Sequence, residues 1–310
     1  MDTNHKKPKA IVICGPTGIG KTGFAIELAQ KFKGEIIGAD SMQIYRTMDI
    51  GTAKPTPVEQ STVRHHMVDI VDPEEPFDAE KYAAMAFQKV SDLSARGTIP
   101  FVVGGTGLYI KSLVFGLFDA DPADPVIRNQ LKAEAEEKGS PFLHQRLGNC
   151  DPETAGKLHA NDTYRIIRAL EVYEITGVPI SEYHHRHRFN SRRLDSLTLG
   201  LQMDRERLYE RIDARVDAMI QAGLLDEVQR LLDAGYSQEM KSMQSIGYRH
   251  MVEFLEGRMD WEETVRTLKR DTRRYAKRQV TWFKADPDMM WVSPEDIRQA
   301  EQAINRFLDS

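Results

Sequence analysis

The sequence predicts an α/β protein built on a parallel sheet with helices on both faces. Two observations carry this prediction. Apolar runs of strand length alternate with amphipathic helical patterns over the first 115 residues, as in doubly wound sheets. The first strand runs into Gly15-Pro16-Thr17-Gly18-Ile19-Gly20-Lys21-Thr22, which fits the phosphate-binding pattern G-x-x-x-x-G-K-[ST]. We therefore expect a P-loop (nucleoside-kinase-like) fold with a helical insertion domain and a helical C-terminal region.

The elements around this loop are those that a phosphate site needs. Residues 10–14 have the length and β-branching of a buried strand, and residues 21–32 continue as an amphipathic helix. The glycines let backbone N–H groups turn toward an anion, and the new helix points its positive end at the same place. Lys21 adds a mobile charge, and the Thr22 hydroxyl is placed to hold a magnesium ion. A chance match on a strand–turn–helix corner is the alternative.

The next apolar strand, residues 34–40, ends at Asp40. Open parallel sheets bind ligands beyond the carboxyl ends of their strands. If this strand pairs beside the first one, the Asp40 carboxylate faces the phosphate loop. The alternative is a structural aspartate that caps the following turn.

A loop and a short strand follow. Glycine and prolines mark residues 50–57 as a loop, and residues 67–71 have the pattern of a strand. The preceding His65-His66 pair suggests a metal site, but neighbouring residues on a strand point to opposite faces. We therefore interpret both histidines as structural.

A second glycine turn lies after the next helix and strand. Asp78 is a good N-cap for a helix over residues 79–96, and residues 99–103 form another buried strand. Gly104-Gly105-Thr106-Gly107 follows and leads into a helix. Because parallel strands end at one edge of the sheet, both glycine turns should lie at that edge.

The pattern changes after residue 116. Residues 116–194 contain several helix signals and no convincing strand, and the clearest helix runs from Asp162 to about Thr176. Residues 197–203 then have the pattern of a strand that returns to the sheet, and helices dominate the remainder. The expected domains are a core of residues 1–116 and 195–310 and a helical insertion of residues 117–194.

The composition is that of an ordinary globular protein. The 310 residues are 41% hydrophobic and 29% charged, and no apolar run is long enough for a membrane helix. Two cysteines, Cys14 and Cys150, cannot make a zinc site by themselves, and a reducing cytoplasm is the expected location. We expect a monomer with no membrane association and no obligate protein partner, because no partner helix is obvious.

Two basic tracts stand out against a net charge of −5. Residues 183–193 are rich in histidine and arginine, and residues 266–284 combine lysines and arginines with Tyr275, Trp282 and Phe283. Nucleic-acid backbones contact local patches rather than the total charge, so both tracts are candidates for RNA contact. The alternative is a pair of solvated helix faces.

The chain is better equipped to hold a diphosphate than to act as a nucleotide-driven motor or switch. P-loop kinases and NTPases need a second carboxylate for magnesium, normally after an apolar strand. Here the strand at residues 99–103 ends in glycines, and the available carboxylate is Asp40.

Motif blocks follow one another in a specific order along nearly the whole chain. They are Gly15 to Thr22, Asp40-Ser41-Met42-Gln43-Ile44-Tyr45, Ile50-Gly51-Thr52-Ala53-Lys54-Pro55, His65-His66 with Asp69, Val103-Gly104-Gly105-Thr106-Gly107-Leu108-Tyr109, Asn161-Asp162 with Arg165, Arg168-Ala169-Leu170-Glu171-Val172, Ile246-Gly247-Tyr248, and Thr272-Arg273-Arg274-Tyr275-Ala276-Lys277-Arg278-Gln279 with Thr281-Trp282-Phe283. This order resembles the tRNA dimethylallyltransferases, also called tRNA isopentenyltransferases, of the bacterial type.

The resemblance implies that a dimethylallyl group moves from dimethylallyl diphosphate to N6 of adenosine 37 in a tRNA anticodon stem-loop, with Mg²⁺ assisting and diphosphate leaving. It implies that Asp40 is the general base, that Thr106 lies near the reacting groups, and that Arg128 contacts the leaving oxygens. Thr22 and Asp40 are the implied metal ligands. The implied diphosphate-binding residues are Gly15, Pro16, Thr17, Gly18, Ile19, Gly20, Lys21 and Thr22.

The resemblance also implies a surface for tRNA, with the insertion domain as part of it. The adenine must leave its stack to be modified, and Gln43 can hydrogen-bond an adenine edge. The implied tRNA-binding residues are Asp40, Ser41, Met42, Gln43, Tyr164, Arg165, Ile166, Ile167, Arg168, Gln244, Ser245, Ile246, Gly247, Tyr248, Arg249, Lys277, Arg278, Gln279, Val280, Thr281, Trp282, Phe283 and Lys284.

Two other functions fit part of the sequence. A small-molecule or nucleotide kinase, with Asp40 deprotonating a hydroxyl acceptor, explains the first 115 residues but neither the basic tracts nor the later blocks. A non-catalytic RNA-binding protein leaves Asp40 at the phosphate edge unexplained.

Overall fold

The computed structural model describes residues 7–116, 124–187 and 191–310. The chain divides into two compact units, one made of Met1–Phe115 with Arg192–Ser310 and the other of Gly116–Ser191. Residues 117–123, at the start of the predicted insertion, and residues 188–190, in the first basic tract, lie outside the described residues.

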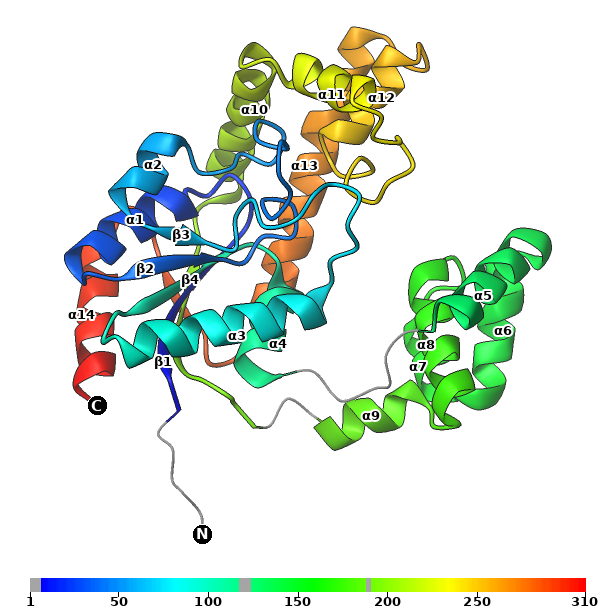
Figure 1. The fold of residues 1–310 in the computed structure, drawn as a ribbon, viewed down its shortest axis with the longest axis horizontal. Helices are drawn as coiled ribbons and strands as arrows, with labels where there is room; N and C mark the ends of the chain where they lie inside the picture. Colours follow the sequence, from blue (N-terminus) through cyan, green and yellow to red (C-terminus); the bar gives the residue numbers. More distant parts are fainter. Residues whose placement is uncertain (1–6, 117–123, 188–190) are drawn as a thin grey trace. The chain divides into compact units, whose positions relative to one another are not determined.

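The larger unit is built on a six-stranded sheet in which the strand pairs are parallel, so the predicted fold class is confirmed (Figure 1). The strand order is β3-β2-β4-β1-β5-β6. The strands are β1 (Lys9–Cys14), β2 (Glu35–Gly38), β3 (His65–His66), β4 (Pro100–Gly104), β5 (Asp195–Leu201) and β6 (Met290–Val292). The sequence pattern does not predict β6, because three residues are too few to show a period.

Helices cover both faces of this sheet, as predicted (Figure 1). Alternate residues of β1 point to opposite faces. Ala10 and Val12 pack with α3 (Ala79–Ala95) and α4 (Gly107–Phe115). Ile11 and Ile13 pack with α1 (Lys21–Lys31) and α14 (Ile297–Asp309). The first strand is therefore buried on both sides and holds the start of the phosphate loop rigidly at its carboxyl end.

The position of β2 differs from the pairing considered for Asp40. β2 does not lie beside β1, because β4 is inserted between them. Gly104 permits this arrangement: a Cβ there would lie 2.0 Å from the carbonyl oxygen of Ala39. Asp40 still follows the carboxyl end of β2, so it lies at the same edge as the phosphate loop but one strand further away.

The predicted strand at residues 67–71 is wrong. The paired residues are His65 and His66, and Val71 makes only an isolated bridge to Tyr45 among the residues described. Met67 and Asp69 have φ angles of 61° and 54°, which lie in the left-handed region and interrupt an extended strand.

Helices make up most of the C-terminal half of the core, as expected. They are α10 (Arg205–Gln221), α11 (Leu224–Asp233), α12 (Tyr248–Leu255) and α13 (Trp261–Lys284), and α2 (Pro57–Thr62) precedes β3. α13 packs against α10, α12 and α4 and carries the second basic tract. Within the described ranges, no helix is long and apolar enough to cross a membrane.

The smaller unit is helical throughout its described residues, as the sequence predicts. Its helices are α5 (Pro125–Lys138), α6 (Ser140–Cys150), α7 (Pro152–Lys157), α8 (Thr163–Thr176) and α9 (Ile180–His187). Asp162 caps the start of α8, and Gly177 ends it with a φ of 70°. Leu131, Leu143 and Leu170 belong to its separate apolar core.

Candidate active site at the phosphate loop

A cavity of about 840 Å³ opens at the carboxyl edge of the sheet in the larger unit. The phosphate loop forms one wall through Thr17, Lys21 and Thr22, and the turn after β2 contributes Asp40 and Gln43. Residues 49–57 and α2 form another wall, and α10 and α13 add Arg215, Tyr275 and Gln279. The predicted anion site and the predicted base therefore share one cavity.

The phosphate loop has the geometry that its glycines predict. Gly18 and Gly20 have φ angles of 82° and 98°, a region that glycine enters without strain. The Lys21 ammonium donates to the carbonyls of Gly15, at 3.0 Å, and Pro16, at 2.9 Å. Burial lowers the pKa of Lys21 to about 8, the nearby Arg215 lowers it too, and Asp40 acts in the opposite direction.

Not every residue of the predicted phosphate set offers a side chain to a ligand. The Ile19 side chain is fully buried in the core beside Phe24 and Leu208, and Pro16 is buried as well. The implied diphosphate contact of Ile19 therefore stays a prediction for its backbone alone. Its backbone remains part of the loop.

Two arginines of α10 lie on the phosphate loop, and the sequence reasoning missed both. Arg211 donates from Nε to the carbonyl of Gly18 at 3.1 Å, and Arg215 donates to the Thr17 hydroxyl at 3.2 Å. A signal was present: Arg207, Arg211 and Arg215 recur every four residues, a spacing that places them on one helix face. Arg215 lines the cavity beside Lys21 and Asp40.

Asp40 both caps a turn and lines the cavity, and its role as the base stays a prediction. Its Oδ1 accepts from the backbone N–H groups of Met42, at 2.8 Å, and Gln43, at 3.3 Å. Thr106 lies next to this turn, because its hydroxyl oxygen accepts from the N–H of Ser41 at 3.0 Å. The N–H of Thr106 also donates to the carbonyl of Ala39 at 3.1 Å.

Gln279 joins the two glycine turns. Its Oε1 accepts from the N–H of Thr17 at 2.8 Å, and its Nε2 donates to the carbonyl of Gly105 at 2.8 Å. The side chain is 6% exposed. Both polar ends of the Gln279 amide thus bind backbone groups inside the protein, and its implied tRNA contact stays a prediction. The expectation that both glycine turns lie at one edge is confirmed.

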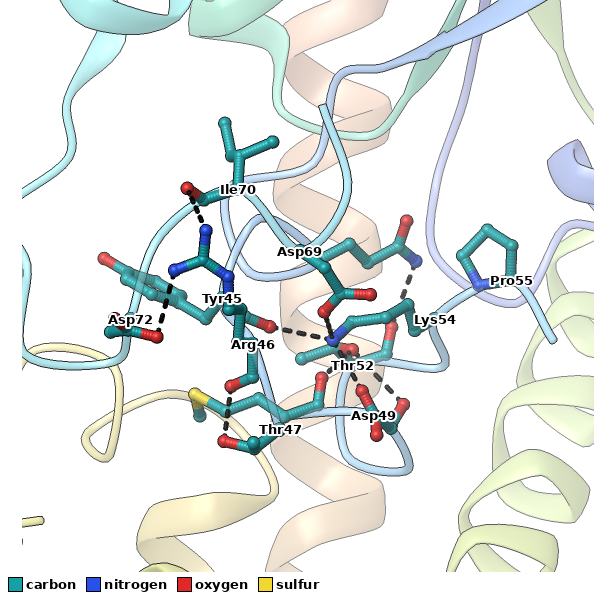
Figure 2. A network of polar contacts seen from close by, with 12 residues as sticks. Tyr45, Arg46, Thr47, Asp49, Thr52, Lys54, Pro55, Asp69, Ile70 and Asp72 are labelled. Carbon is teal, nitrogen blue, oxygen red and sulfur yellow. Dashed lines mark hydrogen bonds and ion pairs between the residues drawn. The ribbon is translucent and has the colours of Figure 1, made fainter. Parts of the chain in front are cut away.

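Lys54 fixes the cavity wall that follows β2 (Figure 2). Its side chain is 4% exposed, and Nζ donates to Asp49 and Asp69 at 2.5 Å each and to the carbonyl of Tyr45 at 2.8 Å. Gln43 donates from Nε2 to the carbonyls of Thr52, at 3.2 Å, and Ala53, at 3.0 Å. The wall is thus held by polar contacts, including those of the buried Lys54 side chain, rather than by regular secondary structure.

The two histidines that follow this wall in the sequence have separate partners. His66 Nε2 lies 2.6 Å from a Glu35 oxygen, and His65 Nδ1 lies 2.7 Å from the carbonyl of Val63. The described residues contain no group of three or more histidine, cysteine or acidic side chains arranged to hold a metal ion.

Arg128 belongs to the smaller unit. It donates to Oε2 of Glu171 at 2.8 Å, and Arg168 donates to the same oxygen at 2.8 Å. Glu171 is fully buried, so it holds both guanidinium groups in fixed positions. The role of Arg128 at the leaving oxygens stays a prediction.

The residues implied to contact tRNA fall into two groups, those with buried side chains and those with exposed ones. Ile166, Ile167, Tyr248 and Phe283 are buried in apolar cores, so their side chains are packed inside the protein, and the implied contact of these positions with tRNA stays a prediction. Tyr164 and Trp282 are 72% and 47% exposed and remain candidates for stacking on bases. The other exposed candidates are Arg165, Gln244, Lys277, Arg278, Thr281 and Lys284.

The second basic tract is neutralised in its first half only. Arg273 pairs with Asp213 and Lys269 with Asp217, both at 2.6 Å. In the part of the chain that the structure describes, no carboxylate pairs with Lys277, Arg278 or Lys284. The available positive charge is therefore concentrated at the C-terminal end of α13.

Comparisons with known proteins agree with this geometry. A family model described as IPP transferase matches residues 43–286. A tRNA dimethylallyltransferase of Desulfosudis oleivorans is 54% identical over 303 residues, covering 97% of this chain and 96% of the relative. A tRNA dimethylallyltransferase 1 of Pelobacter propionicus is 50% identical over 290 residues, covering 94% of each.

Solved structures show the same likeness. The full-length tRNA isopentenylpyrophosphate transferase of Bacillus halodurans is 39% identical with a TM-score of 0.73, covering 98% of this chain and 97% of that one. A eukaryotic dimethylallyltransferase, described as acting on tRNA, is 32% identical with a TM-score of 0.83. The match covers 97% of this chain and 79% of the eukaryotic one.

Proposed function

Because this chain belongs to the IPP transferase family, and its relatives are tRNA dimethylallyltransferases, we propose that it transfers a dimethylallyl group from dimethylallyl diphosphate to N6 of adenosine 37 in tRNA. Dimethylallyl transfer to tRNA follows from the family itself. The donor, the anticodon loop and the acceptor atom are the finer part of the proposal. The observation that supports them best is the single cavity shared by Lys21 and Asp40.

The diphosphate lies at the phosphate loop. Lys21 exchanges its contacts with the Gly15 and Pro16 carbonyls for diphosphate oxygens, and Arg215 lies close enough to the loop to add a second positive charge. As the bond between the allylic carbon and oxygen breaks, negative charge builds up on the leaving diphosphate. Positive groups already in place stabilise that charge without reorganisation.

The acceptor amine lies on the Asp40 side of the cavity. The lone pair of an exocyclic adenine amine is delocalised into the ring, so the nitrogen is a poor nucleophile. As the new bond between N6 and carbon forms, Asp40 takes the amine proton, and diphosphate carries away the electrons of the broken bond. Both hydrogen bonds that orient Asp40 end on Oδ1, which leaves Oδ2 for the amine.

Mg²⁺ fits the oxygen donors present here. The Thr22 hydroxyl and the Asp40 carboxylate line the same cavity, and oxygen ligands with a substrate phosphate are the set that Mg²⁺ favours. When bound, the ion supplies charge neutralisation at the leaving diphosphate. Thr22 and Asp40 would hold it from the protein side.

The target base reaches the cavity from an anticodon loop. Chemistry at N6 requires an unstacked adenine, and exposed aromatic and basic residues such as Tyr164, Trp282 and Lys277 suit contact with the surrounding nucleotides. We place this reaction in the cytoplasm.

One experiment tests the proposal. The protein is incubated with unmodified tRNA, Mg²⁺ and labelled dimethylallyl diphosphate, and in parallel with labelled ATP. Label is expected in tRNA, and nuclease digestion should locate it on the adenine of residue 37. Phosphate transfer from ATP without prenyl transfer would instead indicate a kinase, and label at another nucleotide would reject the acceptor site.

A further inference from the structure

A buried carboxylate from α11, that of Glu227, binds the backbone of the cavity wall at residues 49–51. Glu227 is 4% exposed. Its Oε2 accepts from the N–H groups of Asp49, at 3.1 Å, and Ile50, at 2.8 Å, and its Oε1 accepts from the N–H of Gly51 at 3.1 Å. Three successive backbone amides therefore converge on one charge, which makes each hydrogen bond charge-assisted.

Tyr248 completes this contact. Its hydroxyl donates to Glu227 Oε1 at 2.6 Å, and its ring lies so close to Gly51 that a Cβ there would fall 2.4 Å from a ring carbon. Tyr248 is fully buried. The carboxylate thus has four donors and is well satisfied, which explains how a charge is tolerated at this depth.

The held segment in turn orients Gln43. The carbonyls of Thr52 and Ala53 follow directly after the three amides, and both accept from Nε2 of Gln43. An amide NH2 group has two donors, and two carbonyls use both of them. Oε1 of Gln43 makes no hydrogen bond to any described residue, so the side chain lines the cavity with its acceptor available.

We propose that Glu227 is a positioning residue that acts through the segment 49–53 to present Gln43 Oε1 as a hydrogen-bond acceptor for the amine of the acceptor base. A fixed acceptor discriminates for a base edge with an N–H group and against one with a carbonyl. The inference rests on the proposed function, because it needs an adenine amine in the cavity. Neither Glu227 nor Tyr248 touches the substrate.

The test combines a structural and a kinetic measurement. In Glu227→Gln, hydrogen exchange of the amides of residues 49–51 should accelerate in the ligand-free protein, because an amide side chain carries no charge and turns an NH2 group toward two of the four donors. Asp226→Asn is the matched control: it removes one charge from an exposed neighbour on the same helix. Unchanged exchange in Glu227→Gln would overturn the proposal.

A double-mutant cycle tests the route through Gln43. Glu227→Gln should lower kcat/KM for tRNA about ten- to a hundredfold, the size expected when a charged hydrogen bond is removed. In a Gln43→Ala background the same change should cost less than about threefold, since the affected side chain is already absent. Equal reductions in both backgrounds would show that Glu227 acts by another route and overturn the proposal.

Tyr248→Phe is a milder variant that tests the same contact if Glu227→Gln fails to fold. It keeps the ring against Gly51, removes one of four donors, and should lower kcat/KM by about threefold, again only when Gln43 is present. If Gln43→Ala alone leaves prenylation unchanged, the proposed role of Glu227 is wrong although the transferase function stands. If the unmodified enzyme transfers no label to tRNA, the proposed function itself has failed.

Discussion

The N–H of Thr17 donates to Oε1 of Gln279 at 2.8 Å, although the two residues are 262 positions apart in the sequence. The same amide donates to Gly105 from its other end. A single side chain of α13 therefore sets the distance between the phosphate loop and the turn that carries Thr106. The diphosphate site and the surroundings of Asp40 are consequently held as one unit.

Gln279→Ala should affect both stability and catalysis. It leaves the Thr17 amide and the Gly105 carbonyl without their partner, which costs about 1–3 kcal/mol of unfolding free energy. Looser glycine turns should lower kcat/KM for dimethylallyl diphosphate about ten- to a hundredfold. Denaturant unfolding and steady-state kinetics measure the two effects. Glu262→Gln, an exposed change on the same helix, is the control, and a stability loss without a kinetic effect would contradict this role of Gln279.

Diphosphate binding should depend on pH through Lys21. Its pKa in the ligand-free protein is lowered to about 8, and only the ammonium form attracts the anion. Affinity for inorganic pyrophosphate in the presence of Mg²⁺ should therefore be level below about pH 8. Above that it should fall by up to about tenfold per pH unit, as binding requires uptake of a proton. Calorimetric titration from about pH 6.5 to about pH 9.5 brackets this pKa and measures the effect.

Arg215→Met tests whether Lys21 is the group whose titration causes the loss of pyrophosphate affinity above about pH 8. Arg215 is one cause of the lowered Lys21 pKa, so its removal should move the break to higher pH while weakening affinity overall. Lys21→Met should bind weakly with no break at all. A break at the same pH in Lys21→Met would assign the titration to another group.

Two substitutions separate the role of Asp40 as a turn cap from its role as a general base. Asp40→Asn keeps an oxygen that can accept from Met42 and Gln43, so the turn should persist with an unchanged melting temperature. Asp40→Asn loses the base, so turnover should fall roughly 10²–10⁴-fold, while pyrophosphate affinity measured without Mg²⁺ remains. Asp40→Ala should lose turnover and also about 1 kcal/mol of stability. Turnover that survives in Asp40→Asn would reject the assignment of the base.

Local features of the site were predictable, and long-range ones were not. The phosphate loop and its flanking strand and helix depend on neighbouring residues, so the pattern at residues 15–22 was sufficient. The insertion of β4 between β1 and β2 is a matter of strand order, which no local pattern encodes. Glu227 and Gln279 bind backbone groups far away in the sequence, so neither gave a signal. Arg211 and Arg215 did, through their four-residue spacing.

The second basic tract should act on tRNA through its C-terminal half. Lys277, Arg278 and Lys284 have no carboxylate partner among the described residues, whereas Arg273 is paired with Asp213. Changing the first three to Gln should weaken tRNA binding and lower the slope of log Kd against log salt by about one for each backbone phosphate that the variant no longer neutralises. Arg273→Gln should mainly change stability and leave the slope intact, because its charge is already compensated. Slopes that fall equally in both variants would mean that the whole helix, rather than its end, contacts the RNA backbone.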